Sequence, residues 1–426
     1  MKRGLAILGG VLLLLAALVL SLNLRGEDVI PDNPAPFPAS PVQVVRGEYL
    51  ARVGNCMGCH TVRGGEPYAG GRGFATPFGT VYTPNLTPDA ETGIGGWSSA
   101  HFWRALHNGR SRDGRLLYPV FPYPNYTQVT REDSDALYAY LRSLAPVKRA
   151  NQPHALDFPY NSQASLAVWR ALYFAPGQRR ADPAKSAEWN RGAYLVQGLG
   201  HCNACHSSRN ALGAPTGVLD LGGGLIPMQN WYAPSLTSPD EAGVSTWEAS
   251  DIVNLLRTGV APGASVTGPM AEVVLNSTQY LDDNDSRAMA VFLKDLPALS
   301  PPHAAVPARA GERPPPGQQT RGAKLYEQHC AQCHGDGGEG APGAYPALAG
   351  NRAVTMASPA NLVRIVLEGG FAPATAGNPR PYGMPPFATA LTSDDVAAVL
   401  THLRTSWGNQ APAVTAVEVN RYRGSE

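Results

Sequence analysis

All six cysteines of the chain fall into three Cys-x-x-Cys-His motifs, which constrain the fold more than any other feature. The motifs are CMGCH at residues 56–60, CNACH at 202–206 and CAQCH at 330–334. Two thiols three positions apart can bond the two vinyl groups of one porphyrin, and the following His can ligate the iron. We therefore expect three covalently attached haem c groups. Their attachment residues are Cys56, Cys59, Cys202, Cys205, Cys330 and Cys333, and their proximal ligands are His60, His206 and His334.

Three other uses of paired cysteines fit the sequence less well. Zinc knuckles need four ligands gathered from paired motifs, and no cysteine remains outside the motifs. A thioredoxin-like site needs one motif on a βαβ unit, not three repeats. Structural disulfides suit an exported protein but give no reason for a His after every second Cys. Haem attachment accounts for all of these residues.

The N-terminus has the character of a membrane helix. Lys2 and Arg3 precede an uncharged run from Leu5 to Leu24, long enough to cross ~30 Å of hydrocarbon. The positive end favours the cytoplasm, which places everything after Arg25 on the far side of the membrane. A cleaved signal peptide is the alternative, but its apolar core is usually only about 7–15 residues long. We therefore favour a retained anchor over residues 1–25.

The three motifs stand in a repeated frame. A segment that begins Arg-Gly precedes each motif, and an amphipathic segment with an Asp near its start follows later. These segments are 46–50, 191–195 and 321–325 before the motifs, and 133–144, 283–296 and 394–407 after them. An N-terminal and a C-terminal helix around one haem is the arrangement of class I cytochrome c. The expected fold is therefore all-α, with three class I cytochrome c domains in series after the anchor helix.

Composition shifts set the expected boundaries. Proline-rich stretches at 26–39 and 297–320 predict a stalk and a linker, and a helix is expected over 163–174. The expected parts are an anchor or signal at 1–25, domains at 40–145, 180–298 and 318–408, and a C-terminal tail at 409–426.

The sixth ligand of each iron determines the function of that haem, and a His/Met pair gives a high-potential electron-transfer site. The chain has only seven methionines. Met384, on a proline-stiffened loop 50 residues after His334, is the predicted ligand of the third haem, with Met356 as its alternative. Met270, 64 residues after His206, is predicted for the second haem. Its alternatives are Met228 and Met289.

The first haem has no such methionine. None lies between His60 and Met228, and Phe121 stands where one is expected. Phe has no lone pair, so this iron is predicted to be five-coordinate, to hold water, or to take another ligand, including one from a partner subunit. His107 is the candidate ligand within the domain, followed by His101, although histidines at such positions are more often packing residues.

With these residues in view, the chain resembles the three-haem cytochrome c subunits of membrane-associated bacterial dehydrogenases for alcohols, gluconate, sorbitol, fructose or aldehydes. The resemblance runs from about Val44 to Arg423. It rests on the segments RGEYL at 46–50, YTPNLTPDAETG at 82–93, WNRGAYLVQG at 189–198, GPMAE at 268–272 and GMPP at 383–386. It departs at Phe121, where alcohol and sugar dehydrogenase cytochromes typically carry Met. A Phe there is more similar to cytochromes that accompany molybdenum-containing hydroxylases or aldehyde dehydrogenases.

The resemblance implies an electron-transfer subunit and not an enzyme on its own. A dehydrogenase catalytic subunit, with a small accessory subunit, would oxidise an alcohol, aldehyde or sugar, and the haems would relay electrons to ubiquinone or a terminal oxidase. An aldehyde or molybdenum-type partner is slightly favoured. The alternatives are a peroxidase-like enzyme that uses an open first haem, and a soluble carrier or scaffold. A net charge of +1 gives no basic footprint for nucleic acid.

Overall fold

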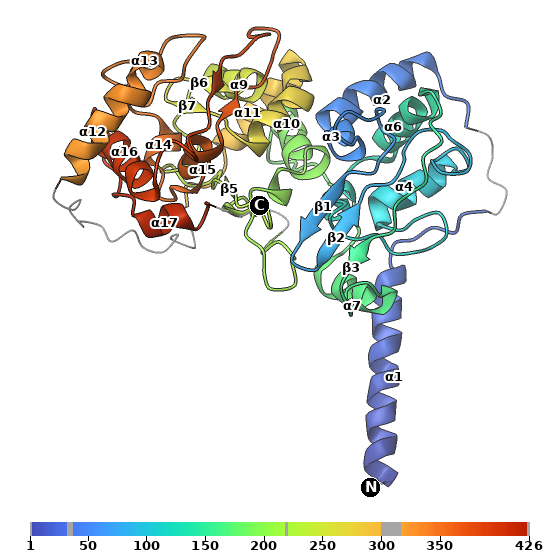
Figure 1. Ribbon diagram of the computed structural model, residues 1–426. Coiled ribbons are helices and arrows are strands. Elements are labelled where there is room, and N and C mark those ends of the chain that lie inside the picture. The colour runs from blue at the N-terminus through green and yellow to red at the C-terminus, as the bar shows by residue number, and fades with distance from the viewer. Residues whose placement is uncertain (1, 32–36, 218–219, 300–316, 424–426) are drawn as a thin grey trace. The chain divides into compact units, whose positions relative to one another are not determined.

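The computed structural model describes residues 2–31, 37–217, 220–299 and 317–423, in two compact units (Figure 1). The first unit consists of Met1–Ala184, Tyr194–His201 and Arg209–Ala214, and the second of Lys185–Ala193, Cys202–Ser208 and Pro215–Glu426. Most of the linker expected at 297–320, and part of the stalk at 26–39, lie outside the described residues. The domain boundaries at 40–145, 180–298 and 318–408 stay predictions.

The N-terminal helix α1 (Lys2–Leu24) is long and apolar enough to cross a membrane. Its last turn packs against α7 (Gln163–Tyr173) of the first unit (Figure 1). The Asn23 side chain, only 6% exposed, donates to the Ala167 carbonyl at 2.9 Å and accepts from Arg170 Nε at 2.9 Å. The helix is therefore joined to the folded part of the chain by buried polar contacts.

Each haem motif is framed by one pair of crossing helices. The pairs are α2 (Pro41–Val53) with α6 (Arg131–Ser143), α8 (Ala187–Ala193) with α11 (Asp283–Lys294), and α12 (Gln318–His329) with α16 (Ser393–Thr405). A glycine stands at every crossing. A Cβ at Gly47, Gly192 or Gly322 would lie 1.9, 1.9 or 2.2 Å from the carbonyl oxygen of Ala136, Ala288 or Ala398. An ion pair also links the two helices each time: Arg46–Asp133, Arg191–Asp285 and Arg321–Asp395. The C-terminal helices begin and end within three residues of the predicted segments.

The expectation of an all-α fold is wrong. Only 44% of the residues that the structure describes are helical, and short antiparallel ladders occupy the stretches between the helices. The strands form a sheet β1 (Gly73–Thr76)–β2 (Gly79–Tyr82)–β3 (Ala155–Leu156) and the pairs β4 (Gly224–Leu225)–β5 (Tyr232–Ala233), β6 (Val260–Ala261)–β7 (Ala264–Ser265) and β8 (Gly370–Phe371)–β9 (Gly383–Met384). These long connections must satisfy their backbone N–H and C=O groups, and pairing with one another does so. Three separate domains in series are not seen either, because the second and third motifs share one unit.

The remaining helices are short and connect these parts. They are α3 (Cys56–His60), α4 (Ser99–Asn108), α5 (Tyr123–Tyr126), the π-helix η1 (Tyr194–Leu199), the 3-10 helices η2 (Cys202–Ala204) and η3 (Thr278–Tyr280), α9 (Ala249–Thr258), α10 (Pro269–Asn276), α13 (Ala331–His334), α14 (Arg352–Thr355), α15 (Ala360–Glu368) and α17 (Ala416–Asn420).

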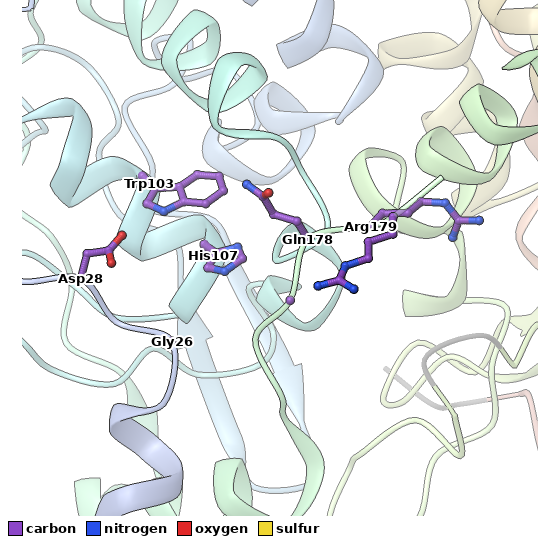
Figure 2. Close-up of a pocket in the computed structure, with 8 residues that line it drawn as sticks. Gly26, Asp28, Trp103, His107, Gln178 and Arg179 are labelled. Carbon is purple, nitrogen blue, oxygen red and sulfur yellow. The ribbon is translucent and has the colours of Figure 1, made fainter. Parts of the chain in front are cut away.

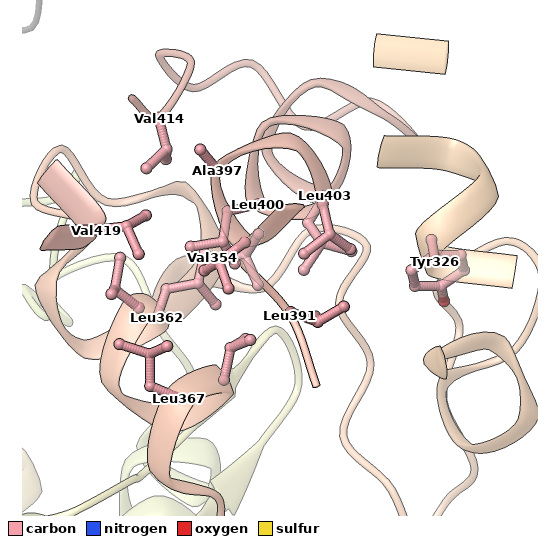
Figure 3. Packing of buried hydrophobic residues seen from close by; sticks show 14 residues of the cluster. Tyr326, Val354, Leu362, Leu367, Leu391, Ala397, Leu400, Leu403, Val414 and Val419 are labelled. Atoms are coloured by element: carbon pink, nitrogen blue, oxygen red, sulfur yellow. The ribbon is translucent and has the colours of Figure 1, made fainter. Parts of the chain in front are cut away.

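A hydrophobic core in the second unit lies between α15 and α16 (Figure 3). Val363 and Leu400 are fully buried at its centre. Val414 and Val419, from the C-terminal tail, are buried in the same core. The described part of the tail, residues 409–423, therefore contributes to this core, which the sequence did not predict.

The candidate haem-attachment sites

Each motif follows closely on the N-terminal segment of its repeat. The helix α2 ends three residues before Cys56, and α12 ends directly before Cys330. All six cysteines lie in the described part of the chain, and no disulfide joins any two of them. Burial, helped by the neighbouring thiol, raises the pKa of Cys56 and Cys202 to about 12 and that of Cys330 to about 11.

The three motif histidines are oriented in the same way. Their Nδ1 atoms lie 2.8, 2.7 and 3.0 Å from the carbonyl oxygens of Pro84, Pro234 and Pro346, for His60, His206 and His334 respectively. A carbonyl only accepts, so Nδ1 carries the proton, and the lone pair of Nε2 is available to a metal. Burial lowers the pKa of all three, that of His60 to about 4, against the opposing effect of the proline carbonyl. The imidazoles are neutral, as an iron ligand requires.

Sequence reasoning missed these prolines as functional residues. The signal was present as a Pro-x-Leu repeat after each motif: Pro84-Asn85-Leu86, Pro234-Ser235-Leu236 and Pro346-Ala347-Leu348. The spacing from the motif histidine differs in the three repeats, at 24, 28 and 12 residues. That variation hides the repeat from a search at fixed spacing.

The third site is a cavity that gathers the predicted residues. Cys330, His334 and Met384 all line it. Its remaining walls are mainly apolar and include Leu348, Val354, Leu362, Ile365, Val366, Phe387, Leu391, Val399 and Leu403. Apolar walls, a thiol and imidazole at one end and a thioether suit a covalently bound porphyrin with a sulfur ligand. The residues present therefore fit the group that the motif predicts.

Strand pairing positions Met384. In β9 this residue pairs with Gly370 of β8, just after α15. A Cβ at Gly369, whose φ is +69°, would lie 2.4 Å from the Met384 carbonyl oxygen. The Phe387 amide donates to the Val366 carbonyl at 3.0 Å. Backbone contacts thus hold the loop that carries the Met384 thioether against the end of α15. These contacts leave no room for a side chain at position 369.

Met270, the predicted ligand of the second haem, is half-buried in the first turn of α10 and stays a prediction. The preceding Gly268 has φ +53°, and a Cβ there would meet the Trp231 ring at 2.7 Å. Its alternatives differ in exposure: Met289 is a core residue of α11 at 4% exposure, and Met228 is 59% exposed. The rival for the third site, Met356, is also buried, at 6% exposure.

Aromatic residues surround the first motif. Phe121 packs on Tyr126 with ring centroids 5.3 Å apart, and the Tyr126 hydroxyl donates to the Gly54 carbonyl at 3.4 Å. Burial raises the pKa of Tyr126 well above its usual value, and the charges of Cys56 and Cys59 add to this effect. Tyr126 therefore lies beside the motif thiols, next to the phenylalanine that replaces the expected methionine.

In the described part of the chain, the contacts of His107 and His101 are with residues outside the first motif, and their assignment as candidate ligands stays a prediction. His107 is stacked on Trp103 with centroids 4.5 Å apart, and its Nδ1 lies 3.4 Å from Thr127 Oγ1. It lines a cavity of about 430 Å³ together with Trp103, Asp28 and Arg179 (Figure 2), and no residue of the first motif lines this cavity. His101 instead accepts from the Ser98 amide at 3.2 Å and so caps α4.

Sequence reasoning also missed His201. It belongs to the first unit and has a left-handed backbone with φ of 39°. Its Nε2 lies 3.3 Å from the Gly54 carbonyl oxygen, and its ring packs edge-on against Tyr126 at 5.5 Å. Burial lowers its pKa. No periodicity marks this residue, which precedes Cys202 directly in the chain.

Comparisons with known proteins agree with this geometry. The family model for cytochrome c matches residues 44–145 and 319–407. The cytochrome c subunit of a quinone alcohol dehydrogenase from Gluconacetobacter polyoxogenes is 38% identical over 89% of this chain and 84% of its own length. The gluconate 2-dehydrogenase cytochrome c subunit of Pantoea cypripedii is 38% identical over 91% of both chains. The fructose dehydrogenase cytochrome subunit of Gluconobacter japonicus is 34% identical over 95% of this chain and 87% of its own length.

Proposed function

This chain belongs to the family of cytochrome c subunits that serve bacterial dehydrogenase complexes, and we propose that it carries three covalent haems. Within the family these chains are electron-transfer subunits and not the catalytic ones. The observation that carries the count is the threefold repetition of one set of features. Each motif has its crossing glycine, its Arg–Asp pair and a histidine held by a proline carbonyl.

The residues that would hold each haem follow from the sites. The paired cysteines of a motif provide the covalent links, and its histidine presents Nε2 to the iron. In the third site Met384 provides a thioether, and the apolar walls of the cavity exclude water. Met270 has this role in the second site. A bound haem c supplies one-electron redox chemistry, while the protein fixes its ligands and surroundings.

The partner is a dehydrogenase catalytic subunit, accompanied by a small accessory subunit. It would oxidise an alcohol, aldehyde or sugar. Phe121 favours an aldehyde or molybdenum type of enzyme. From the haems the electrons pass to ubiquinone or a terminal oxidase. The relatives named for alcohol, gluconate and fructose dehydrogenases support a partner of this general class.

We place the chain at the periplasmic face of the inner membrane, held by a retained α1. The contacts of Asn23 support retention, because cleavage after this helix would leave the buried Arg170 without one of its partners. Glu27, just beyond the helix, also forms an ion pair with Arg110. A removable signal peptide has no need of such contacts.

Copurification tests this function. The chain expressed with its partner dehydrogenase should show haem reduction when substrate is added, and the isolated chain should show none. Haem reduction by substrate in a preparation without any second polypeptide would contradict the proposal. Phe121 motivates the competing peroxidase function, so the isolated chain should also be assayed with peroxide, where we expect no turnover.

A further inference from the structure

The helix α7 exposes an apolar stripe. Ala164, Val168 and Leu172 follow one another at four-residue spacing, and all three are exposed. Val168 is 48% and Leu172 is 64% exposed, and Phe158, just before the helix, is 85% exposed. We call these four residues the α7 surface. Contiguous exposed apolar side chains of this kind mark an interaction site more often than a random feature.

The segment around the α7 surface exposes no charge. From Phe158 to Gly177 the only charged residue is Arg170, which is 3% exposed and engaged with Asn23. Charged residues make up 16% of the whole chain, so a charge-free surface over 20 residues stands out. An exposed face without charge is suited to an environment less polar than bulk water.

The inner face of α7 is already occupied by α1. Asn23 of α1 bonds both the Ala167 carbonyl and the Arg170 side chain, at 2.9 Å each. The apolar side chains of α1 are themselves exposed, for example Leu12 at 57%. The α7 surface therefore lies on a helix that packs against the end of α1, and the apolar composition of α1 is suited to lipid.

Polar and aromatic residues flank this region as they do at a membrane boundary. Arg25 follows α1 and Arg180 follows the charge-free segment, and both are exposed. Gly26 and Arg180 line the same cavity (Figure 2), which places the ends of the two segments close together. Trp169 and Tyr173 lie on α7 with rings 5.5 Å apart. Arginines favour phosphate headgroups, and Trp and Tyr are enriched at the interfacial layer.

We propose that the α7 surface lies in the interfacial layer of the membrane that α1 enters, so that the first unit rests on the bilayer instead of hanging from a free tether. At 11 residues α7 is too short to span a bilayer, and it is suited to lie at the boundary. This inference rests on the proposed membrane attachment through α1. Lipid, and not a protein partner, is the chosen occupant because α7 packs against the end of α1, which is long and apolar enough to enter a membrane.

Spin labels on single engineered cysteines test the proposal in the full-length holoprotein, whose native cysteines are blocked by haem. Labels are placed by Val168→Cys, Leu172→Cys and Phe158→Cys. Leu12→Cys in α1 is the lipid control. Val42→Cys, on an apolar residue 77% exposed in α2, is the matched control for water. With the protein in phospholipid vesicles, accessibility to oxygen is compared with accessibility to a water-soluble nickel chelate.

We expect labels at 168, 172 and 158 to favour oxygen over the nickel chelate, as at 12, and the label at 42 to favour the chelate. Labels at 168 and 172 that behave like the one at 42, while 12 stays in lipid, would overturn the α7 proposal and leave the anchor intact. A label at 12 that is accessible to the chelate would overturn the membrane attachment and the inference with it. A label at 172 shielded from both reagents would indicate a protein contact and would also overturn the proposal.

Discussion

The first and third haem regions share one frame and differ on the side of the sixth ligand. Both have a glycine at the helix crossing, an Arg–Asp pair and a motif histidine bonded to a proline carbonyl. In the third, Met384 lines the cavity of the motif. In the first, Phe121 packs on Tyr126 instead. We therefore expect the repeat to determine haem attachment and the proximal ligand, and a loop that can change independently to determine the distal ligand.

Removal of the thiols should have the largest effect and the same effect in both regions. Each pair, Cys56→Ala with Cys59→Ala and Cys330→Ala with Cys333→Ala, should lower the haem count from three to two per chain, because the thioether links depend only on the motif. Intact-mass measurement and haem quantification check this. A chain that starts with two haems, or a variant that keeps three, would show that a motif is not an attachment site.

Substitutions at the two distal positions should reverse the difference in iron ligation between the first and third regions. Met384→Phe should leave the haem attached but remove its thioether ligand, lower the potential of that iron and open it to carbon monoxide. Phe121→Met should provide a thioether ligand to the first iron, raise its potential and close it to carbon monoxide. Axial ligands control haem potentials over about 0.8 V, so redox titration of both variants resolves the change. Met356→Leu, at the buried rival, is the matched control and should change neither property.

The helix crossings should be equally sensitive in both regions. Gly47→Ala and Gly322→Ala each put a Cβ against a carbonyl oxygen, at 1.9 and 2.2 Å. Each should lower the free energy of unfolding by about 1–3 kcal/mol through overpacking. Gly377→Ala is the control, since nothing lies within 4 Å of its Cβ position. Thermal unfolding should show a lower midpoint for the first two variants only. Unchanged midpoints would mean that the helices do not cross at these glycines.

The smallest effect concerns Asp395 of the third region. Although partial burial acts to raise its pKa, hydrogen bonds from Thr392 and the ion pair with Arg321 lower it overall. A lowered carboxyl pKa contributes stability above the unfolded pKa, and this is lost as the pH falls through the folded value. Asp395→Asn should therefore lower the free energy of unfolding by about 0.5–1 kcal/mol at pH 7. The difference in this free energy from the unsubstituted chain should shrink as the pH falls below about 4. A difference that is independent of pH would contradict this.

The helices could be predicted because their signals are local. The caps Thr130, Asp282 and Thr392 each accept from a backbone amide in the first turn, and the apolar spacing behind them is helical. The expected helix at 163–174 is α7, which ends one residue earlier. Such elements do not depend on the rest of the fold.

The strands could not all be predicted, for a physical reason. Pairs of two residues, such as β8 with β9, have no alternation to detect and exist only because the fold brings the loops together. The hairpin of β1 and β2 is different. Its strands meet around Pro77 and Phe78, next to Gly79 with φ +110°, and this turn was a usable signal. The contact of His201 with Gly54 depends on the tertiary fold alone.

The most direct test counts sulfur-ligated irons in the intact, oxidised holoprotein. The charge-transfer band that reports an iron–thioether bond is quantified against the total haem of the same sample. We expect two equivalents per three haems, assigned to Met270 and Met384, with the first iron contributing none because Phe121 has no lone pair. Three equivalents per three haems would contradict the difference between the first and third regions.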